Sequence, residues 1–331
     1  MVKVKIDPEA ELSWSRKRWG RGFRYFDEQG APLREPAQLR RVRKLAIPPM
    51  WQDVRICPTP CGKVQAVGRD LKGRKQYIYH QEWAAERQRR KFRALRTFGK
   101  RLPRLRSYAL EQLRRKGWPR EKVLALMVLI LDETGIRIGN RQYLERNETY
   151  GLSTLRRRHL DHEDDALLFH YRGKSSKDRE VRIEDPMLMR FIRKTAEQPG
   201  YEIFRYQNPD GSWEMVDSDD INTFIRDHVG EKFSSKYFRT WVANRCLLEQ
   251  HATATAHKAQ NPRLSLERTL VRLVADELGN TPTVCKNYYL HPVVLRRALR
   301  APSLEVAEER QLIVPDLDAT EVLLLRMMRG S

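Results

Sequence analysis

The sequence predicts an α+β protein with a small β-rich N-terminal domain, residues 1–90, and a larger, mainly α-helical domain, residues 91–331. Three observations indicate this division. Short alternating segments between glycine-containing turns fill the first part, as in antiparallel strands. Apolar residues at helical spacing dominate the second part. The charge is uneven as well, since residues 1–90 carry 21 basic and 10 acidic side chains, about half of the net charge of +21.

In the first domain, the expected strands are segments that alternate between apolar and polar residues beside turn-forming residues. These strands are residues 23–26, 54–57, 63–67 and 76–80. The first leads into Asp27-Glu28-Gln29-Gly30, where glycine suits a turn that needs a positive φ. A basic helix should end before Pro48 and Pro49, because proline lacks an amide donor and restricts the residue before it.

In the second domain, a very basic helix is expected from Gln81 to Arg115, with an interruption at Pro103. Residues 123–131 are apolar all round, which favours a central buried helix. Further helices are expected at residues 218–228, 237–250, 266–278 and 321–329, with Ser218 as the first N-cap and Gly279 ending the third. A hairpin of residues 167–172 and 179–183 interrupts the helices, beside a solvated acidic loop at 161–165.

The sequence lacks the features of several classes of protein. Its longest apolar run, Val123–Leu131, has nine residues, whereas a membrane-spanning helix needs about 20. The first residues do not form the apolar segment of a secretory signal, so a cytoplasmic protein is expected. Cys57 and Cys61 have no second pair to complete a zinc site, so reduced thiols and no bound metal are expected. No Gly-x-x-x-x-Gly-Lys-Ser/Thr loop supports nucleotide hydrolysis of that type.

The positive charge points to nucleic acid as the partner. A surplus of 21 positive charges repels itself unless a polyanion neutralises it. The arginine-rich helix after Gln81 fits two interpretations, a solvated linker or a helix that lies along a phosphate backbone. In the second interpretation, Arg87, Arg89, Arg90 and Lys91 lie next to phosphates.

Four short islands carry groups that bind phosphate without a metal. They are Ile136–Asn140 with Arg137, the hairpin tip with Lys174, Lys236–Trp241 with Arg239, and Gly279–Pro282 with Asn280, followed by Tyr289. Taken singly, each island has an ordinary structural interpretation, because lysines in turns are commonly solvated and a lone tyrosine commonly packs in a core. An arginine that is half-buried among apolar residues, however, needs an anionic partner.

Taken together and in this order, Arg137, Lys174, Arg239, Asn280 and Tyr289 resemble the catalytic constellation of type IB DNA topoisomerases, above all their small poxviral and bacterial branch. That family carries an Ile-Arg-x-Gly island, a Gly-Lys hairpin, a Lys-x-Phe/Leu-Arg-Thr-Trp/Tyr island and a Gly-His/Asn-Thr-Pro island before its tyrosine. Several ordered motifs make a stronger signal than any single short pattern.

The likeness runs from about residue 23 to about residue 299 and includes Ile47–Trp51 and Gly73–His80 in the first domain. It implies a catalytic domain related to those of tyrosine recombinases. It also implies a monomer that binds duplex DNA in the nucleoid, with no cofactor, no nucleotide and no membrane partner.

The resemblance implies relaxation of supercoiled duplex DNA without ATP or metal, by transient cleavage of one strand through a 3′-phosphotyrosyl ester and resealing. Tyr289 would be the nucleophile, and Lys174 would protonate the leaving 5′ oxygen. Arg137 and Arg239 would each donate two hydrogen bonds to the phosphorane-like centre.

Asn280 departs from the commoner pattern, because many relatives have histidine at that position. The asparagine amide donates a hydrogen bond but cannot be protonated, so an active enzyme is expected if the group serves as a donor. Tyr288 is expected to point away from Tyr289 and to pack elsewhere.

Gln76, Tyr77 and Tyr79 match family positions that contact DNA, and Lys236 matches a basic position near the site. Glutamine pairs bidentately with adenine, and tyrosine hydroxyls reach phosphates. The alternative is an ordinary alternating strand with Tyr77 and Tyr79 on one face.

Three rival functions remain open. A tyrosine recombinase uses a related set, but usually has histidine three residues before its second arginine, where this sequence has Lys236, and usually has a helical N-terminal domain. A DNA-binding protein with a decayed site is supported only by Asn280. RNA binding is supported by charge alone, since the aromatic residues follow no RNA-recognition pattern.

Overall fold

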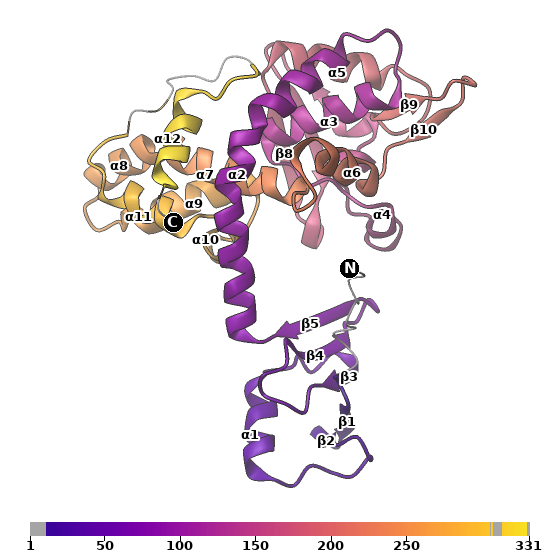
Figure 1. Cartoon of the computed structure of the whole chain (residues 1–331), viewed down its shortest axis with the longest axis vertical. Helices are drawn as coiled ribbons and strands as arrows, with labels where there is room; N and C mark the ends of the chain where they lie inside the picture. The colour runs from indigo at the N-terminus through magenta and orange to yellow at the C-terminus, as the bar shows by residue number, and fades with distance from the viewer. Residues whose placement is uncertain (1–10, 305, 307–312, 330–331) are drawn as a thin grey trace. The chain divides into compact units, whose positions relative to one another are not determined.

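The chain folds into two compact units that divide between Lys91 and Phe92. A computed structural model describes residues 11–304, 306 and 313–329 (Figure 1). The first unit is built on a β-sheet and the second is mainly helical, so the α+β class is confirmed.

The N-terminal unit contains a five-stranded antiparallel sheet in the order β2-β1-β3-β4-β5 and the helix α1 (Figure 1). Its elements are β1 (Trp14–Trp19), β2 (Gly22–Phe26), α1 (Pro36–Lys44), β3 (Gln52–Ile56), β4 (Val64–Arg69) and β5 (Lys75–Tyr79). All four expected strands are present. Val42 of α1 packs with Trp14, Val54, Ile56 and other apolar residues to form the core of this unit.

β1 was not predicted, because it carries an arginine at an inward-facing position. Arg16 is 9% exposed. Its guanidinium donates hydrogen bonds to the carbonyl oxygens of Ile47, Pro48 and Trp51 at 3.0, 3.0 and 2.7 Å. The buried charge is therefore matched by backbone acceptors, and it holds the Ile47–Trp51 loop against the sheet.

The second unit consists of helices with two small sheets. Its helices are α2 (Gln81–Leu113), which starts in the first unit, α3 (Arg120–Thr134), α4 (Arg141–Asn147), α5 (Pro186–Ala196), α6 (Ser218–Val229), α7 (Ser235–Glu249), α8 (His251–Gln260), α9 (Leu266–Leu278), α10 (Pro282–Tyr288), α11 (Pro292–Arg300) and α12 (Ala319–Met327). Its strands are β6 (Leu160–His162), β7 (Leu167–Arg172), β8 (Asp178–Ile183), β9 (Arg205–Gln207) and β10 (Trp213–Met215). Among the described helices, none has the length and apolar character needed to cross a bilayer.

Helix α3 lies at the centre of the helical core, as its apolar sequence predicts. Every residue from Val123 to Leu131 is buried. The helix packs against α7, and it ends at Gly135, which adopts a left-handed conformation with φ of 60°. The chain leaves the core at that point, immediately before Arg137.

Three local predictions were wrong. Helix α2 continues through Pro103, because Leu102 and Leu105 beside it are buried in the core and their packing outweighs a proline cost of about 3 kcal/mol. The N-cap of α6 is Asp217, whose carboxylate accepts from two backbone amides, rather than Ser218. Asp161 lies in β6, paired with Leu168, rather than in a loop.

A buried ion-pair network joins four helices of the second unit. Arg106 of α2 donates to Asp132 of α3 at 2.6 Å and to both carboxylate oxygens of Glu321 of α12 at 2.9 and 2.6 Å. Trp241 of α7 donates its indole N–H to Glu321 at 2.9 Å. Arg106, Asp132 and Glu321 are each at most 1% exposed, so each charge depends on the others for its partners.

We expect Glu321→Gln to destabilise the protein by about 3 kcal/mol, because the change leaves the charge of Arg106 partly uncompensated in the core. Urea unfolding followed by circular dichroism measures the loss. The matched control is Glu163→Gln, which removes an exposed partner of Arg182 and should cost less than about 1 kcal/mol. Equal effects of the two changes would contradict the structural role of Glu321.

Candidate active site

Arg137 is positioned by a short pairing of two segments. Leu152 donates its backbone N–H to the carbonyl of Arg137 at 2.8 Å, and Ser153 donates to Ile138 at 2.7 Å. The two segments approach closely at Gly139 and Gly151, where a Cβ on Gly151 would lie 2.4 Å from the nitrogen of Gly139. The glycines of these two sequence islands therefore allow the backbone contact that fixes Arg137 beyond the end of α3.

Arg239 of α7 is buried, with 6% of its surface exposed, and it donates mainly to backbone carbonyls at helix ends. Its Nη1 donates to the carbonyl of Gly135 at 2.7 Å, and its Nη2 donates to the carbonyl of Leu278. The C-terminal ends of α3 and α9 thus both hold this guanidinium, through carbonyls that carry the negative end of the helix dipole.

Asn280 joins the two arginines. Its Oδ1 accepts a hydrogen bond from Arg137 Nη2 at 2.6 Å and another from Arg239 Nη2 at 3.1 Å. Its Nδ2 is buried and has no hydrogen-bond partner among the described residues. The same holds for Nε of Arg239. Buried donors without a protein partner, such as these two, are expected in a site where a ligand supplies the acceptor oxygens.

Tyr289 lies beside this cluster at the end of α10. The Cζ of Arg239 is 5.5 Å from the centre of the Tyr289 ring. Asn244 of α7 fixes the backbone there, since its Nδ2 donates to the carbonyl of Tyr289 at 2.9 Å and its Oδ1 accepts from the amide of His291 at 2.7 Å. Tyr288 is 58% exposed, so the prediction that it packs was wrong.

The electrostatics of the cluster favour an anion. Burial, and then the neighbouring charge of Arg137, lower the pKa of Arg239 to about 10, so it stays charged at neutral pH. Burial also lowers the pKa of Arg137. Within the described residues, neither guanidinium donates to a carboxylate. This differs from Arg106, and it leaves two adjacent positive charges without a counterion.

Among the described residues, no hydrogen bond, ion pair or ring contact joins Lys174 to this cluster. It is exposed in the short 3-10 turn, Lys174–Ser176, between β7 and β8. The turn is closed by a hydrogen bond from the amide of Gly173 to the carbonyl of Lys177 at 2.8 Å. Arg179 of the same hairpin was not predicted as a site residue, and its Nη2 donates to the carbonyl of Glu277 at 3.3 Å. The hairpin register, with Arg179 opposite Tyr171, is the signal that could have found it.

The predicted DNA-contacting residues of the first unit lie on the edge strand β5. The Tyr77 and Tyr79 rings stack 5.9 Å apart, and Tyr79 stacks on Trp83 at 4.8 Å. Gln76 points to the other face by strand alternation and donates to Asp70 at 3.0 Å. Lys236 belongs to the second unit, where it is exposed on the first turn of α7.

A basic hollow of about 560 Å³ lies on the sheet of the first unit. It is lined by Ser15, Arg16, Lys17, Asp53, Val54, Arg55, Val67, Gly68, Arg69 and Lys75. Most of its charged side chains are positive, so this surface favours a polyanion.

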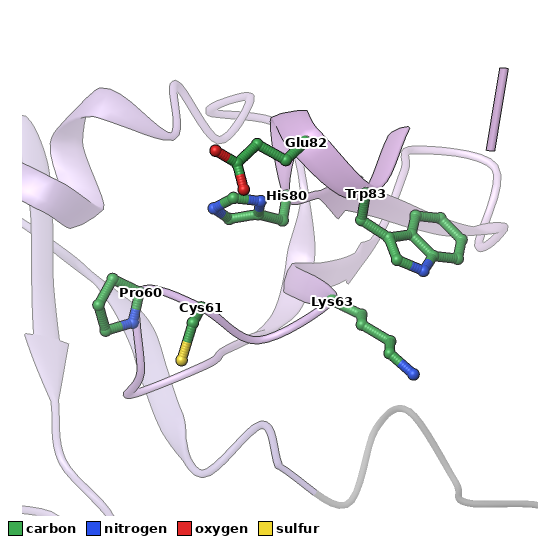
Figure 2. A pocket seen from close by; sticks show the side chains of 6 residues that line it. All are labelled: Pro60, Cys61, Lys63, His80, Glu82 and Trp83. Atoms are coloured by element: carbon green, nitrogen blue, oxygen red, sulfur yellow. The ribbon is translucent and has the colours of Figure 1, made fainter. Parts of the chain in front are cut away.

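A second hollow, of about 400 Å³, lies where β5 meets α2 (Figure 2). It is lined by Pro60, Cys61, Lys63, His80, Glu82 and Trp83, and it contains none of the predicted catalytic residues. Within the part of the chain that the structure describes, no group of three or more His, Cys, Asp or Glu side chains is arranged to hold a metal ion.

Comparison with known protein families shows which family the chain belongs to. Residues 73–309 match the model for the catalytic core of eukaryotic DNA topoisomerase I. Residues 22–70 match the N-terminal domain of bacterial DNA topoisomerase IB. The chain belongs to the type IB DNA topoisomerase family. It is therefore a DNA-binding enzyme of that family, and its N-terminal unit is of the bacterial type.

Two viral members of the type IB topoisomerases show the extent of the similarity. DNA topoisomerase 1B of Acanthamoeba polyphaga mimivirus is 26% identical over 275 residues, which cover 81% of each chain. DNA topoisomerase 1B of vaccinia virus (strain Western Reserve) is 23% identical over 247 residues, covering 73% of this chain and 75% of the viral one. A solved complex of the XerH site-specific recombinase bound to difH substrate aligns over 59% of this chain and 51% of its own, at 13% identity and a TM-score of 0.34.

Stability should fall as the pH decreases from about 6.5 to about 4, in part through His291. Burial lowers the pKa of His291 to about 4, from an ordinary value of 6.5. Between these values the unfolded chain binds a proton that the folded chain does not, which favours unfolding. In the folded chain, Nδ1 of His291 accepts from Val293 at 3.2 Å as the N-cap of α11.

The variant His291→Asn keeps a capping acceptor without the titration. Its urea midpoint should therefore depend less steeply on pH between 7 and 4.5 than that of the original protein. A remaining slope is expected from His159, because burial and neighbouring arginines lower its pKa to about 4 as well. An unchanged slope in His291→Asn would contradict a buried, neutral His291.

Proposed function

We propose that this enzyme relaxes supercoiled duplex DNA by cutting one strand, holding it as a 3′-phosphotyrosyl ester and resealing it, without ATP or metal. One observation carries the proposal. Two arginines without a carboxylate partner converge on Oδ1 of Asn280 directly beside Tyr289, among the described residues. A phosphodiester placed there would complete the hydrogen bonding of the site and balance its charge.

The chemistry follows from this placement. The Oη of Tyr289 attacks the phosphorus, the phenolic proton passes to solvent, and the bond to the 5′ oxygen breaks. The strand then remains on the enzyme as an ester, and attack by the free 5′ hydroxyl reverses the step. Because the ester conserves the bond energy, resealing needs no nucleotide. The cut strand rotates about its partner before resealing, which removes supercoils.

Each polar residue of the cluster has a role in this scheme. Arg137 and Arg239 stabilise the extra negative charge on the equatorial oxygens of the transition state. The free Nδ2 of Asn280 donates to a non-bridging oxygen, so the asparagine acts as a donor and not as an acid. Lys174 protonates the leaving 5′ oxygen. Its exposed place in the hairpin turn leaves its amine accessible to bound DNA.

We further propose that the first unit binds the duplex through Gln76, Tyr77 and Tyr79. The basic hollow that includes Lys17 and Arg55 supports this role, since phosphate contacts position a protein on DNA. Lys236 adds a phosphate contact close to Arg239, one helical turn away on α7. A single chain supplies all of these groups, which favours a monomer that needs no cofactor.

Relaxation of supercoiled plasmid in EDTA and without ATP tests the function. The original protein should relax the plasmid, and Tyr289→Phe should not, because it lacks the nucleophilic oxygen. The matched control is Tyr288→Phe, a change at an exposed neighbour that should relax the plasmid normally. Relaxation by Tyr289→Phe would show that another residue is the nucleophile.

Asn280→Ala should slow single-turnover cleavage by about 10²–10³-fold, the usual effect of losing one transition-state donor. Asn280→Asp should be slowed at least as much. It keeps an oxygen for Arg137 and Arg239, but it loses the Nδ2 donor and places a negative charge beside the phosphate. Near-normal cleavage by either variant would contradict the donor role of Asn280.

A further inference from the structure

The side chain of Arg179 in β8 packs against two glycines, Gly173 and Gly279. Each glycine immediately precedes a residue of the proposed catalytic set. A Cβ on Gly173 would lie 2.6 Å from Cγ of Arg179, so the aliphatic part of the side chain lies on the residue before Lys174. A Cβ on Gly279 would lie 1.3 Å from Nη1 of Arg179, so the guanidinium lies on the residue before Asn280. Only glycine leaves room for this side chain at both places.

A hydrogen bond to the backbone holds the guanidinium in that position. Its Nη2 donates to the carbonyl of Glu277 at 3.3 Å, close to the end of α9. Tyr171 is the residue opposite Arg179 in the hairpin. Tyr171 is 8% exposed and packs in the core, so the base of the hairpin is anchored. The side chain therefore connects the hairpin to the turn that begins at Gly279.

We propose that Arg179 is a positioning residue that holds the hairpin carrying Lys174 in register with the turn carrying Asn280. The inference rests on the proposed function, since it assigns Arg179 to the proton-donating step of the same site. Lys174 has no contact of its own that fixes it against Arg137, Arg239 or Asn280 among those described. Arg179 provides the connection that places its amine relative to the phosphate.

This role differs from that of a phosphate-binding arginine. Nη1 of Arg179 lies against the backbone of Gly279, and Nη2 is used by the carbonyl of Glu277. Loss of Arg179 should therefore reduce protonation of the leaving group more than stabilisation of the transition-state oxygens. The two effects can be separated by the chemistry of the leaving group.

The test compares single-turnover cleavage of two DNA duplexes. One has an ordinary 5′ oxygen at the cleavage site, and the other has sulfur in place of that bridging oxygen. A thiol has a pKa of about 8.5 and leaves as the thiolate, so its departure needs no general acid. Arg179→Ala should cleave the ordinary DNA about 10²-fold more slowly than the original protein and the sulfur-containing DNA within about threefold of it. Lys174→Ala should show the same pattern, whereas Arg137→Ala should be slow on both.

Two further variants separate positioning from loss of folding. Gly173→Ala keeps Arg179 but places a methyl group against its side chain, at a backbone φ of −93° that alanine tolerates, and it should reproduce the pattern of Arg179→Ala. Arg182→Ala changes an exposed arginine of the same strand, which pairs with acidic residues, and it should cleave both substrates normally.

Two results would overturn the inference. If Lys174→Ala is rescued by sulfur and Arg179→Ala is folded but slow on both substrates, Arg179 acts on the phosphate and does not position Lys174. If Lys174→Ala is itself not rescued, the proposed role of Lys174 is wrong, and the inference fails with it. Plasmid relaxation by the original protein but not by Tyr289→Phe would still support the proposed function in either case.

Discussion

The arrangement of the site depends on the way in which Arg239 is buried. This guanidinium is held by the carbonyl oxygens of Gly135 and Leu278, at the ends of α3 and α9, and shares Oδ1 of Asn280 with Arg137. Backbone carbonyls satisfy its donors without cancelling its charge. A carboxylate in their place would bind the arginine more tightly and would remove the field that attracts phosphate. The core thus holds a buried cation, and under the proposed function its counterion is the DNA phosphate.

Two residues after Arg239, the same helix, α7, takes part in a charge network that is fully compensated. Trp241 donates to Glu321, which also neutralises Arg106 together with Asp132. One face of α7 is therefore fixed by a compensated ion network, and another face presents an uncompensated arginine. The network links α7 to α3 through α12 and α2, so the two helices cannot easily move apart to relieve the repulsion between the charges of the site. Stability and function are assigned to different sides of one helix.

Much of this could be predicted from the sequence, because its strongest patterns are local. Alternation located four strands of the first unit, and the apolar run located α3. The order of the islands singled out Arg137, Arg239, Asn280 and Tyr289. The structure shows these four residues in one cluster, and their catalytic roles stay a prediction. What could not be predicted depends on contacts distant in sequence. The strand β1 could not be predicted, because the backbone acceptors that allow Arg16 to be buried lie more than thirty residues away. The helix α2 continues through Pro103 because of packing that its local sequence does not show. The contact of Arg179 with Gly279 joins residues a hundred positions apart. No local pattern carries such information.

Identification of the covalent link tests the central claim most directly. The enzyme would be mixed with supercoiled DNA, denatured rapidly with detergent and digested, and the peptide joined to DNA would be sequenced by mass spectrometry. The account predicts that the DNA is attached to Tyr289 through a phosphate at the 3′ end of the cut strand. Attachment to Tyr288 or to any other residue, or through a 5′ phosphate, would contradict the account, because the two arginines would then not surround the phosphate under attack.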